Sequence, residues 1–178
     1  MKKLLLFAFM GLLFLSCASI KTYRDDLKGS TRYYTDDSVE WGAFLNIIVY
    51  DNEVNNTIFA LKVRTQALPD YINLKEIYFF DQNTKKNISF LLDDSKNDMV
   101  YISGYYTGYA YVPSQTFKIA EGTKIMNIKE INSLYDFMTN SKKPYIRFYG
   151  DFQIDNYLPS GQQKNIIKLI EKYRNGLK

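Results

Sequence analysis

The sequence predicts a mainly β fold with two late α-helices, in which an antiparallel β-sandwich or barrel-like sheet carries a C-terminal helix packed on it. Short runs of apolar, β-branched and aromatic residues recur about every 10 residues between positions 43 and 120, with polar turns between them. Beyond position 127 the apolar residues recur with the period of a helix. The 178 residues include 16 tyrosines and 12 phenylalanines, which favour strands. An α+β class with strands first and helices last follows from these patterns.

Four strands are expected in the first half of the chain. They cover residues 43–51, 57–65, 74–81 and 87–92. Polar residues 52–56 predict a hairpin turn between the first two strands. A second turn is expected at 81–85, and Asp93, Asp94 and Ser95 are expected to stop the fourth strand.

The next two expected strands cover residues 99–112 and 116–120, broken by Gly104, Gly108 and Pro113. If the longer one is extended, alternate residues form two faces. One face carries rings and hydroxyls, namely Tyr101, Ser103, Tyr105, Thr107, Tyr109 and Tyr111. The other is expected to point to the core and contains Val100, Ile102, Gly104, Tyr106, Gly108, Ala110 and Val112.

The tyrosine stripe is a candidate for ligand binding, with Tyr101, Tyr105, Tyr109 and Tyr111 as its rings. Tyrosine and hydroxyl side chains suit sugar or peptide recognition, because rigid rings give contact area at a low cost in entropy. Two alternatives stay open. Cross-strand tyrosines can simply stabilise a sheet, and the glycines permit a tight turn at 104–108 that would break the stripe.

The first helix is expected at residues 128–140. Asn127 and Glu130 have the spacing of a capping box. The apolar stripe of this helix contains Ile128, Ile131, Leu134, Tyr135 and Met138. A strand at 145–152 should follow, since Tyr145, Arg147 and Tyr149 alternate there with apolar residues. Arg147 is a second possible ligand-binding residue, for which cation–π packing is expected and anion binding is the alternative.

The final helix is expected to begin at a second capping box, formed by Ser160 and Gln163 and directly preceded by Pro159. Gly176 stands where a glycine usually ends a helix. The apolar face of this helix contains Ile166, Ile167, Leu169, Ile170 and Tyr173. Such a face should pack over an open side of the sheet.

The N-terminus has the layout of a secretory signal. Lys2 and Lys3 precede an apolar run at 4–15, and small residues surround Cys17, the single cysteine. A helix needs about 20 apolar residues to cross a bilayer, so this run is expected to act as a signal and not as a permanent span.

The junction Phe14-Leu15-Ser16-Cys17 resembles the lipobox of bacterial lipoproteins, in the relaxed form seen in spirochaetes and some other AT-rich bacteria. Ser16 fits the small residue before the cysteine, while Phe14 stands where leucine is usual. The resemblance covers about the first 20 residues. It implies that diacylglycerol is attached to the Cys17 thiol, that the peptide is cut before Cys17 and that the new amine is acylated, for example with palmitate.

The resemblance also implies a location in the cell envelope. Ala18, in place of an acidic residue, implies the outer membrane by analogy with Gram-negative sorting. Two alternatives stay open: cleavage at the small residues Ser16 and Ala18 would release a soluble secreted protein, and Cys17 could serve as a thiol for intermolecular pairing.

Three regions are expected along the chain. They are the signal peptide at 1–16, a lipidated N-terminus and polar tether at 17–37, and a single β-rich globular domain at 38–178. Without the signal about 160 residues remain, which is the size of one domain.

The composition excludes the commonest catalytic chemistries. The chain has no histidine, and acylation of Cys17 would leave no free thiol, which excludes Ser-His-Asp and Cys-His catalysis and His/Cys zinc sites. The net charge of +4 falls to about +2 when the two lysines of the signal are lost, and no basic stripe is present. We therefore expect no nucleic-acid binding, no cofactor, no metal and no catalytic residue.

Carboxylates support two weaker alternatives. A histidine-free glycoside hydrolase would use paired carboxylates. The candidates are Glu76, Asp81, Glu130 and Asp151. Calcium could bind at one of two acidic clusters, although neither has EF-hand spacing. The clusters are Asp93 and Asp94 with Asp98, and Asp36 and Asp37 with Glu40.

These observations predict a membrane-anchored exported lipoprotein that serves as a binding or structural module of the cell envelope and is not an enzyme. Its expected partners are the bilayer, through acylated Cys17, and an envelope protein or glycan. The alternatives are the glycan hydrolase and a subunit of an envelope assembly. A flat tyrosine-lined sheet face would favour binding, whereas carboxylates roughly 5–10 Å apart in a cleft would favour hydrolysis.

Overall fold

The computed structural model describes residues 20–27, 29–35, 37–40, 43–52, 57–66 and 72–176. Within these ranges the chain is mainly β with two late helices and antiparallel sheets, which confirms the predicted fold class. Cys17, the signal at 1–16 and Asp36 lie outside the described residues. None of the helices in the described ranges has the length and apolarity needed to cross a membrane.

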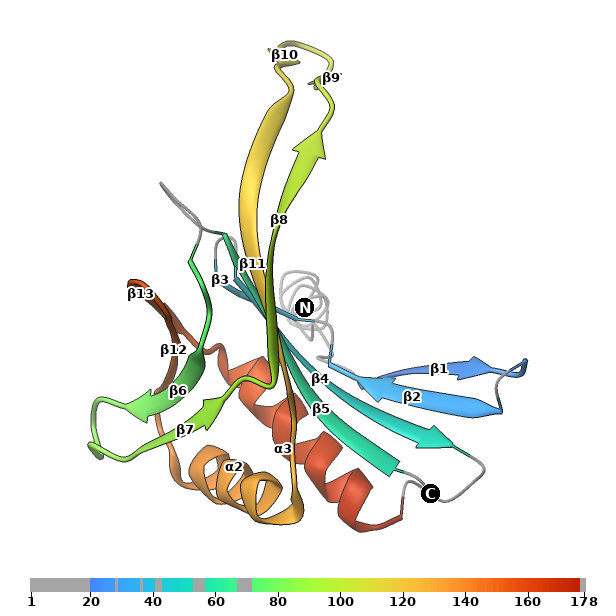
Figure 1. Cartoon of the computed structure of the whole chain (residues 1–178), viewed down its shortest axis with the longest axis vertical. Helices are drawn as coiled ribbons and strands as arrows, with labels where there is room; N and C mark the ends of the chain where they lie inside the picture. The colour runs from blue at the N-terminus through green and yellow to red at the C-terminus, as the bar shows by residue number, and fades with distance from the viewer. Residues whose placement is uncertain are drawn as a thin grey trace, which may run out of the picture.

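A large sheet forms one side of the molecule (Figure 1). Its strands are β1 (Lys21–Asp25), β2 (Ser30–Tyr34), β3 (Asp37–Glu40), β4 (Ala43–Asn52), β5 (Thr57–Gln66), β8 (Asp94–Ile102) and β11 (Gln115–Ile125). The strand order is β1-β2-β4-β5-β11-β8, with β3 also paired to β4, and every pair is antiparallel. The expected hairpin of β4 and β5 is confirmed, with Ala43 opposite Thr65 and Asp51 opposite Thr57.

A small sheet has the order β13-β12-β6-β7. Its strands are β6 (Glu76–Asp81), β7 (Asn87–Leu91), β12 (Pro144–Tyr149) and β13 (Gln153–Tyr157). The pairing of β6 with β12 joins segments more than sixty residues apart, with Pro144 opposite Asp81 and Tyr149 opposite Glu76. A short pair, β9 (Tyr105–Tyr106) and β10 (Tyr111–Val112), completes the strands of the described residues.

The two helices, α2 (Ile128–Asn140) and α3 (Ser160–Arg174), lie next to each other and cover the core. Helix α2 contacts β7, and α3 contacts β4, where the Gln162 amide donates a buried hydrogen bond to the carbonyl of Leu45 at 3.0 Å. The core draws from both sheets and both helices and includes Ile47, Val49, Phe59, Leu61, Phe79, Phe148, Leu134, Met138, Ile166 and Leu169. The expected packing of the last helix on the sheet is therefore confirmed.

The N-terminal boundary differs from the prediction. Residues 17–37 were expected to form a tether, but β1 and β2 belong to the large sheet. Strand β2 pairs with β4 from Ser30 opposite Asn52 to Tyr34 opposite Ile48. Ile20 and Tyr33 pack against the core. The segment reads as polar because β1 is almost entirely exposed and most of β2 is only half-buried, so neither strand has a clear alternation of buried and exposed residues.

The capping box predicted at the start of α2 is present, but the one predicted at the start of α3 is not formed. At α2 the capping box is confirmed, because the Asn127 side chain accepts from the N–H groups of Lys129 and Glu130, while Glu130 accepts from the Asn127 N–H at 2.8 Å. At α3 the expected box is wrong. Pro159 occupies the cap position and makes no side-chain bond.

Gln163, the other member of the box expected at α3, instead connects the two helices. Its amide donates to the carbonyls of Met138 and Ser141 at 2.6 and 2.8 Å, which satisfies groups at the end of α2. The predicted glycine at the end of α3 is confirmed, since Gly176 has a φ of +77°.

Two strand predictions also need correction. The strand expected at 87–92 does end before Asp93, since β7 stops at Leu91, but the next strand was expected from residue 99 and β8 already begins at Asp94. The Asp93 carboxylate accepts from the Ile125 N–H at 2.6 Å and from Lys124 Nζ at 3.0 Å, so it holds the neighbouring strand in place. The strand expected at 145–152 ends at Tyr149, and β13 follows after a bend at 150–152.

Candidate functional site

The outer face of the small sheet is lined with aromatic side chains. Along β6 and β12 the residues alternate, so that Ile77, Phe79, Ile146 and Phe148 are fully buried while their neighbours reach solvent. The neighbours on the solvent side, together with one tyrosine from β13, form what we call the aromatic face. It consists of Tyr78, Phe80, Tyr145, Arg147, Tyr149 and Tyr157.

Strand register brings these residues into rows. Tyr145 lies opposite Phe80 on one neighbouring strand and opposite Tyr157 on the other. Arg147 lies opposite Tyr78 and Asp155 in the next row. Because side chains directly opposite each other are about 5 Å apart at Cβ, the rows make a continuous surface.

The rings of the aromatic face contact one another. Phe80 and Tyr145 are stacked, with centroids 5.3 Å apart and an interplanar angle of 18°. Tyr145 meets Tyr157 edge to face at 5.5 Å, and Tyr78 meets Tyr149 in the same way at 6.0 Å. These contacts limit ring rotation, so the aromatic face is ordered before any ligand arrives.

Arg147 is fixed in the middle of the aromatic face. Its Nε and Nη2 donate to the two carboxylate oxygens of Asp155 at 2.6 and 2.7 Å. The hydrogen bonds to Asp155 raise the pKa of Arg147. The guanidinium carbon lies 5.2 Å from the centroid of the Phe80 ring, which is the cation–π packing expected from the sequence.

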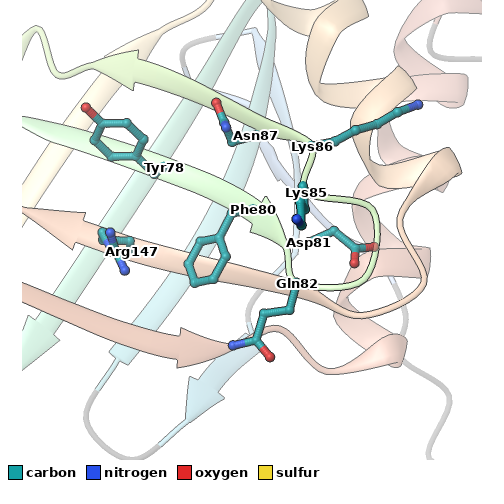
Figure 2. A pocket seen from close by; sticks show the side chains of 8 residues that line it. All are labelled: Tyr78, Phe80, Asp81, Gln82, Lys85, Lys86, Asn87 and Arg147. Carbon is teal, nitrogen blue, oxygen red and sulfur yellow. The ribbon is translucent and has the colours of Figure 1, made fainter.

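A hollow of about 410 Å³ lies at one end of the aromatic face, beside the β6–β7 turn. Its lining residues are Tyr78, Phe80, Asp81, Gln82, Lys85, Lys86, Asn87 and Arg147. Figure 2 shows Tyr78, Phe80 and Arg147 next to one another on β6 and β12, with Asn87 and Gln82 at the border. The hollow therefore combines ring surface with amide and charged groups.

Asp81 sets the shape of the turn beside the hollow. The side chain is only 1% exposed. One carboxylate oxygen accepts from the backbone N–H groups of Asn83 and Thr84 at 2.7 and 3.3 Å. The other accepts from the backbone N–H groups of Lys142 and Lys143 at 2.7 and 3.3 Å. Burial alone would raise the pKa of Asp81, but these four donors outweigh it and lower the pKa.

Polar and charged groups contact the rings at the edges of the aromatic face. Lys143 Nζ lies 5.8 Å from the ring centroids of both Tyr145 and Tyr157. A hydrogen bond with Glu76 raises the pKa of Tyr78. Every tyrosine hydroxyl that stays protonated can both donate and accept hydrogen bonds.

Neither the family models, nor the curated proteins, nor the solved structures contain a match to this chain.

The structure separates the binding residues that the sequence suggested. Arg147 lies on the small sheet, whereas Tyr101, Tyr105, Tyr109 and Tyr111 lie on a long hairpin that projects from the large sheet (Figure 1). We call this hairpin, residues 99–118, the arm.

The expected tyrosine stripe is interrupted on the arm. The chain turns back at 107–110, where the Thr107 N–H donates to the Ala110 carbonyl at 2.9 Å. Tyr111 therefore lies on the returning strand, opposite Tyr106, with ring centroids 5.1 Å apart. A Cβ on Gly104 would collide with the Tyr111 hydroxyl, so glycine permits this close approach.

The second face of that segment was expected to point to the core, and this is wrong. Ile102 is 46% exposed and Tyr106 is 80% exposed. No helix or sheet of the described part of the chain covers the arm beyond the large sheet, so alternation along its strands does not distinguish an inside from an outside.

The carboxylates considered for hydrolysis lie on different elements and have their own partners. Asp81 holds its turn, and Glu130 caps α2. Asp151 accepts from the Asn73 amide at 2.5 Å, and Glu76 interacts with Tyr78. Among the described residues, no three His, Cys, Asp or Glu side chains are grouped so that they could hold a metal ion.

Sequence reasoning missed Tyr78, Phe80, Tyr157 and Asn87 as site residues. Rings on both sides of β6 concealed which side faces solvent, since Phe79 and Phe80 are adjacent. The alternation of Tyr145, Arg147 and Tyr149 along β12 was visible, and it was the only local signal for the aromatic face.

Proposed function

We propose that this chain is a lipid-anchored binding module of the bacterial cell envelope whose aromatic face binds glycan. The observation that supports glycan binding is the row of contacting rings on the outer face of the small sheet. Tyr145 and Phe80 stack beside Tyr157, and the parts of these rings that reach solvent offer apolar surface against which a sugar ring can pack.

The polar border of the aromatic face suits the hydroxyl groups of a sugar. Asn87 and Gln82 offer amide donors and acceptors, and the tyrosine hydroxyls offer both. The ion pair of Arg147 with Asp155 fixes the centre of the surface, so little side-chain entropy is lost when a ligand binds. Binding is proposed over hydrolysis because the candidate carboxylates are held by separate partners.

The binding proposal is tested with soluble peptidoglycan fragments and soluble envelope polysaccharide, titrated by calorimetry. The test variant is Tyr145→Ser with Tyr149→Ser, and the matched control is Tyr106→Ser with Tyr109→Ser on the arm. We expect the first pair to weaken binding about tenfold or more and the control to leave it unchanged. Equal affinities in both variants, or no binding of either glycan, would contradict the proposal.

The anchor is proposed from the sequence at the N-terminus. Lys2 and Lys3, the apolar run at 4–15 and Cys17 among small residues support export and acylation, and Ala18 supports a final place in the outer membrane. Cells that express the wild type or Cys17→Ala are grown with labelled palmitate. We expect label and a lipid-modified N-terminal peptide, measured by mass spectrometry, in the wild type alone. An unmodified Cys17 in the mature wild type would refute the anchor.

A further inference from the structure

The charged residues of the hairpin stop at nearly the same height on its two strands, and no charged residue lies between that height and the tip. Asp98 pairs with Ile119, and Met99 pairs with Lys118. Beyond these pairs, residues 100–117 contain no Asp, Glu, Lys or Arg. The charged and uncharged parts of the hairpin are therefore separated by a plane across both strands.

The uncharged part exposes apolar and aromatic side chains on both of its faces. Tyr101 is 66% exposed on one face, and its neighbour Ile102 is 46% exposed on the other. Near the turn, Tyr109 is fully exposed and Tyr106 is 80% exposed. Exposed apolar surface of this kind marks a binding surface. Because it covers both faces, its occupant must surround the hairpin.

The backbone of the arm limits how deep that occupant can be. Among the described residues, β5 pairs with β11 only from Ile119 onward, so Gln115–Lys118 pair with β8 alone and no other described strand lies along either edge of the arm. Unpaired backbone groups at an open edge are not tolerated in hydrocarbon. They can be satisfied by water and polar groups in the headgroup region of a bilayer.

We propose that the arm inserts its tip into the headgroup region of a membrane. Tyrosine is favoured at this depth, because its ring contacts the acyl chains while its hydroxyl stays hydrated. The tip has no cation, so the matching surface is zwitterionic lipid and not an anionic one. A bilayer also surrounds the hairpin, whereas the flat surface of a protein would cover one face and leave Ile102 or Tyr101 in water.

The arm is long enough for this role. From Met99 to Thr107 an extended chain covers about 26 Å. The tip can therefore contact a bilayer while the two sheets remain in solution. This proposal concerns a different surface from the aromatic face and does not depend on glycan binding.

The test uses the full chain with a polarity-sensitive fluorescent amino acid at position 109. A matched label at position 82, on the β6–β7 turn, reports on the body. With phosphatidylcholine vesicles, we expect a blue shift at position 109 and quenching by bromines near the glycerol end of the acyl chains. The signal should be independent of salt and no larger with anionic lipid. The label at position 82 should show neither effect.

Three results would overturn the proposal. Vesicles could leave the emission at position 109 unchanged, or bromines at the ends of the acyl chains could quench it best, which would place the tip in hydrocarbon. A blue shift that grows with protein concentration in the absence of vesicles would indicate a second copy as the occupant. Because the label reports on the tip alone, an acyl anchor at Cys17 does not by itself produce the expected signal.

Charge on the tip provides an independent check, with the label moved to position 105. Tyr106→Asp with Tyr109→Asp should reduce the vesicle signal by up to about fivefold per charge. Both side chains are exposed, so circular dichroism and thermal unfolding should match the wild type. The same charges placed by Gln82→Asp and Asn87→Asp should leave the signal intact. A tip variant that keeps the full signal would refute the proposal.

Discussion

Arg147 and Asp155 lie directly opposite each other on β12 and β13. They form an ion pair joined by two hydrogen bonds in the middle of the aromatic face. The pair is half-exposed, so water screens part of its attraction. Its contribution combines charge with geometry, because the planar guanidinium also packs on Phe80.

A double-mutant cycle with Arg147→Ala and Asp155→Ala should give a coupling of about 1 kcal/mol in urea unfolding. Arg147→Lys should retain less than half of this coupling, since an ammonium group cannot make the same paired contact. The matched control is Arg24 with Asp26, an exposed pair at 2.7 Å, for which the coupling should be close to zero. A coupling no larger than that of the control would show that the pair does not fix the aromatic face.

Asp81 should make stability depend on acid pH. Its pKa is lowered in the folded state, so the folded chain holds the ionised form more strongly than the unfolded chain does. The resulting stability is fully present above the unfolded pKa of about 4 and is lost as pH falls through the folded pKa. Urea unfolding between pH 7 and pH 2 measures this loss.

Asp81→Asn should remove part of that dependence and cost roughly 2 kcal/mol at pH 7. The amide of asparagine would direct N–H groups at two of the four backbone donors that the carboxylate accepts. Asp136→Asn, at an exposed position on α2, is the control and should change neither quantity. An unchanged pH profile in Asp81→Asn would show that other carboxylates carry the acid sensitivity.

The two helix starts offer a matched pair of cap variants. Asn127→Ala should cost about 1 kcal/mol, because it removes the side-chain oxygen that accepts from two N–H groups. Ser160→Ala should cost almost nothing, since the cap of α3 makes no side-chain bond. Thermal unfolding of both variants measures the difference. Equal losses would mean that Ser160 acts as a cap in solution.

We expect Gln163 to stabilise the fold through its hydrogen bonds to the end of α2 and not by capping α3. Gln163→Ala should cost about 1 kcal/mol, and Gln163→Glu should cost more, because a carboxylate would face the carbonyls of Met138 and Ser141. The control is Gln153→Glu on the exposed side of β13, which should be nearly neutral. Chemical unfolding at neutral pH, where glutamate is charged, distinguishes the two variants.

The local part of the fold was predictable from the sequence. Strand alternation located β4 and β5, and the pair Asn127 and Glu130 located the start of α2, because each signal depends on neighbours within a few residues. The start of β8 was missed for a non-local reason. Asp94 and Ser95 resemble turn residues, but they pair with Thr123 and Gly122 of β11, nearly thirty residues away.

The candidate site was predictable only in fragments. Alternation along β12 showed that Tyr145, Arg147 and Tyr149 share a side, but it could not show which rings lie beside them. That depends on the register of β6 against β12, which long-range pairing sets. Strand β13 was missed because its outward residues, Gln153 and Asp155, are polar and its apolar residues are few.

The position of β1 determines how far an acylated Cys17 would let the protein move from its membrane. Only Ala18, Ser19 and Ile20 separate that cysteine from the first strand, which begins at Lys21. Four residue steps span at most about 14 Å even when fully extended. With such a short linker the body could tilt and rotate at the bilayer surface but could not leave it. Any ligand of the aromatic face would then have to come to the membrane.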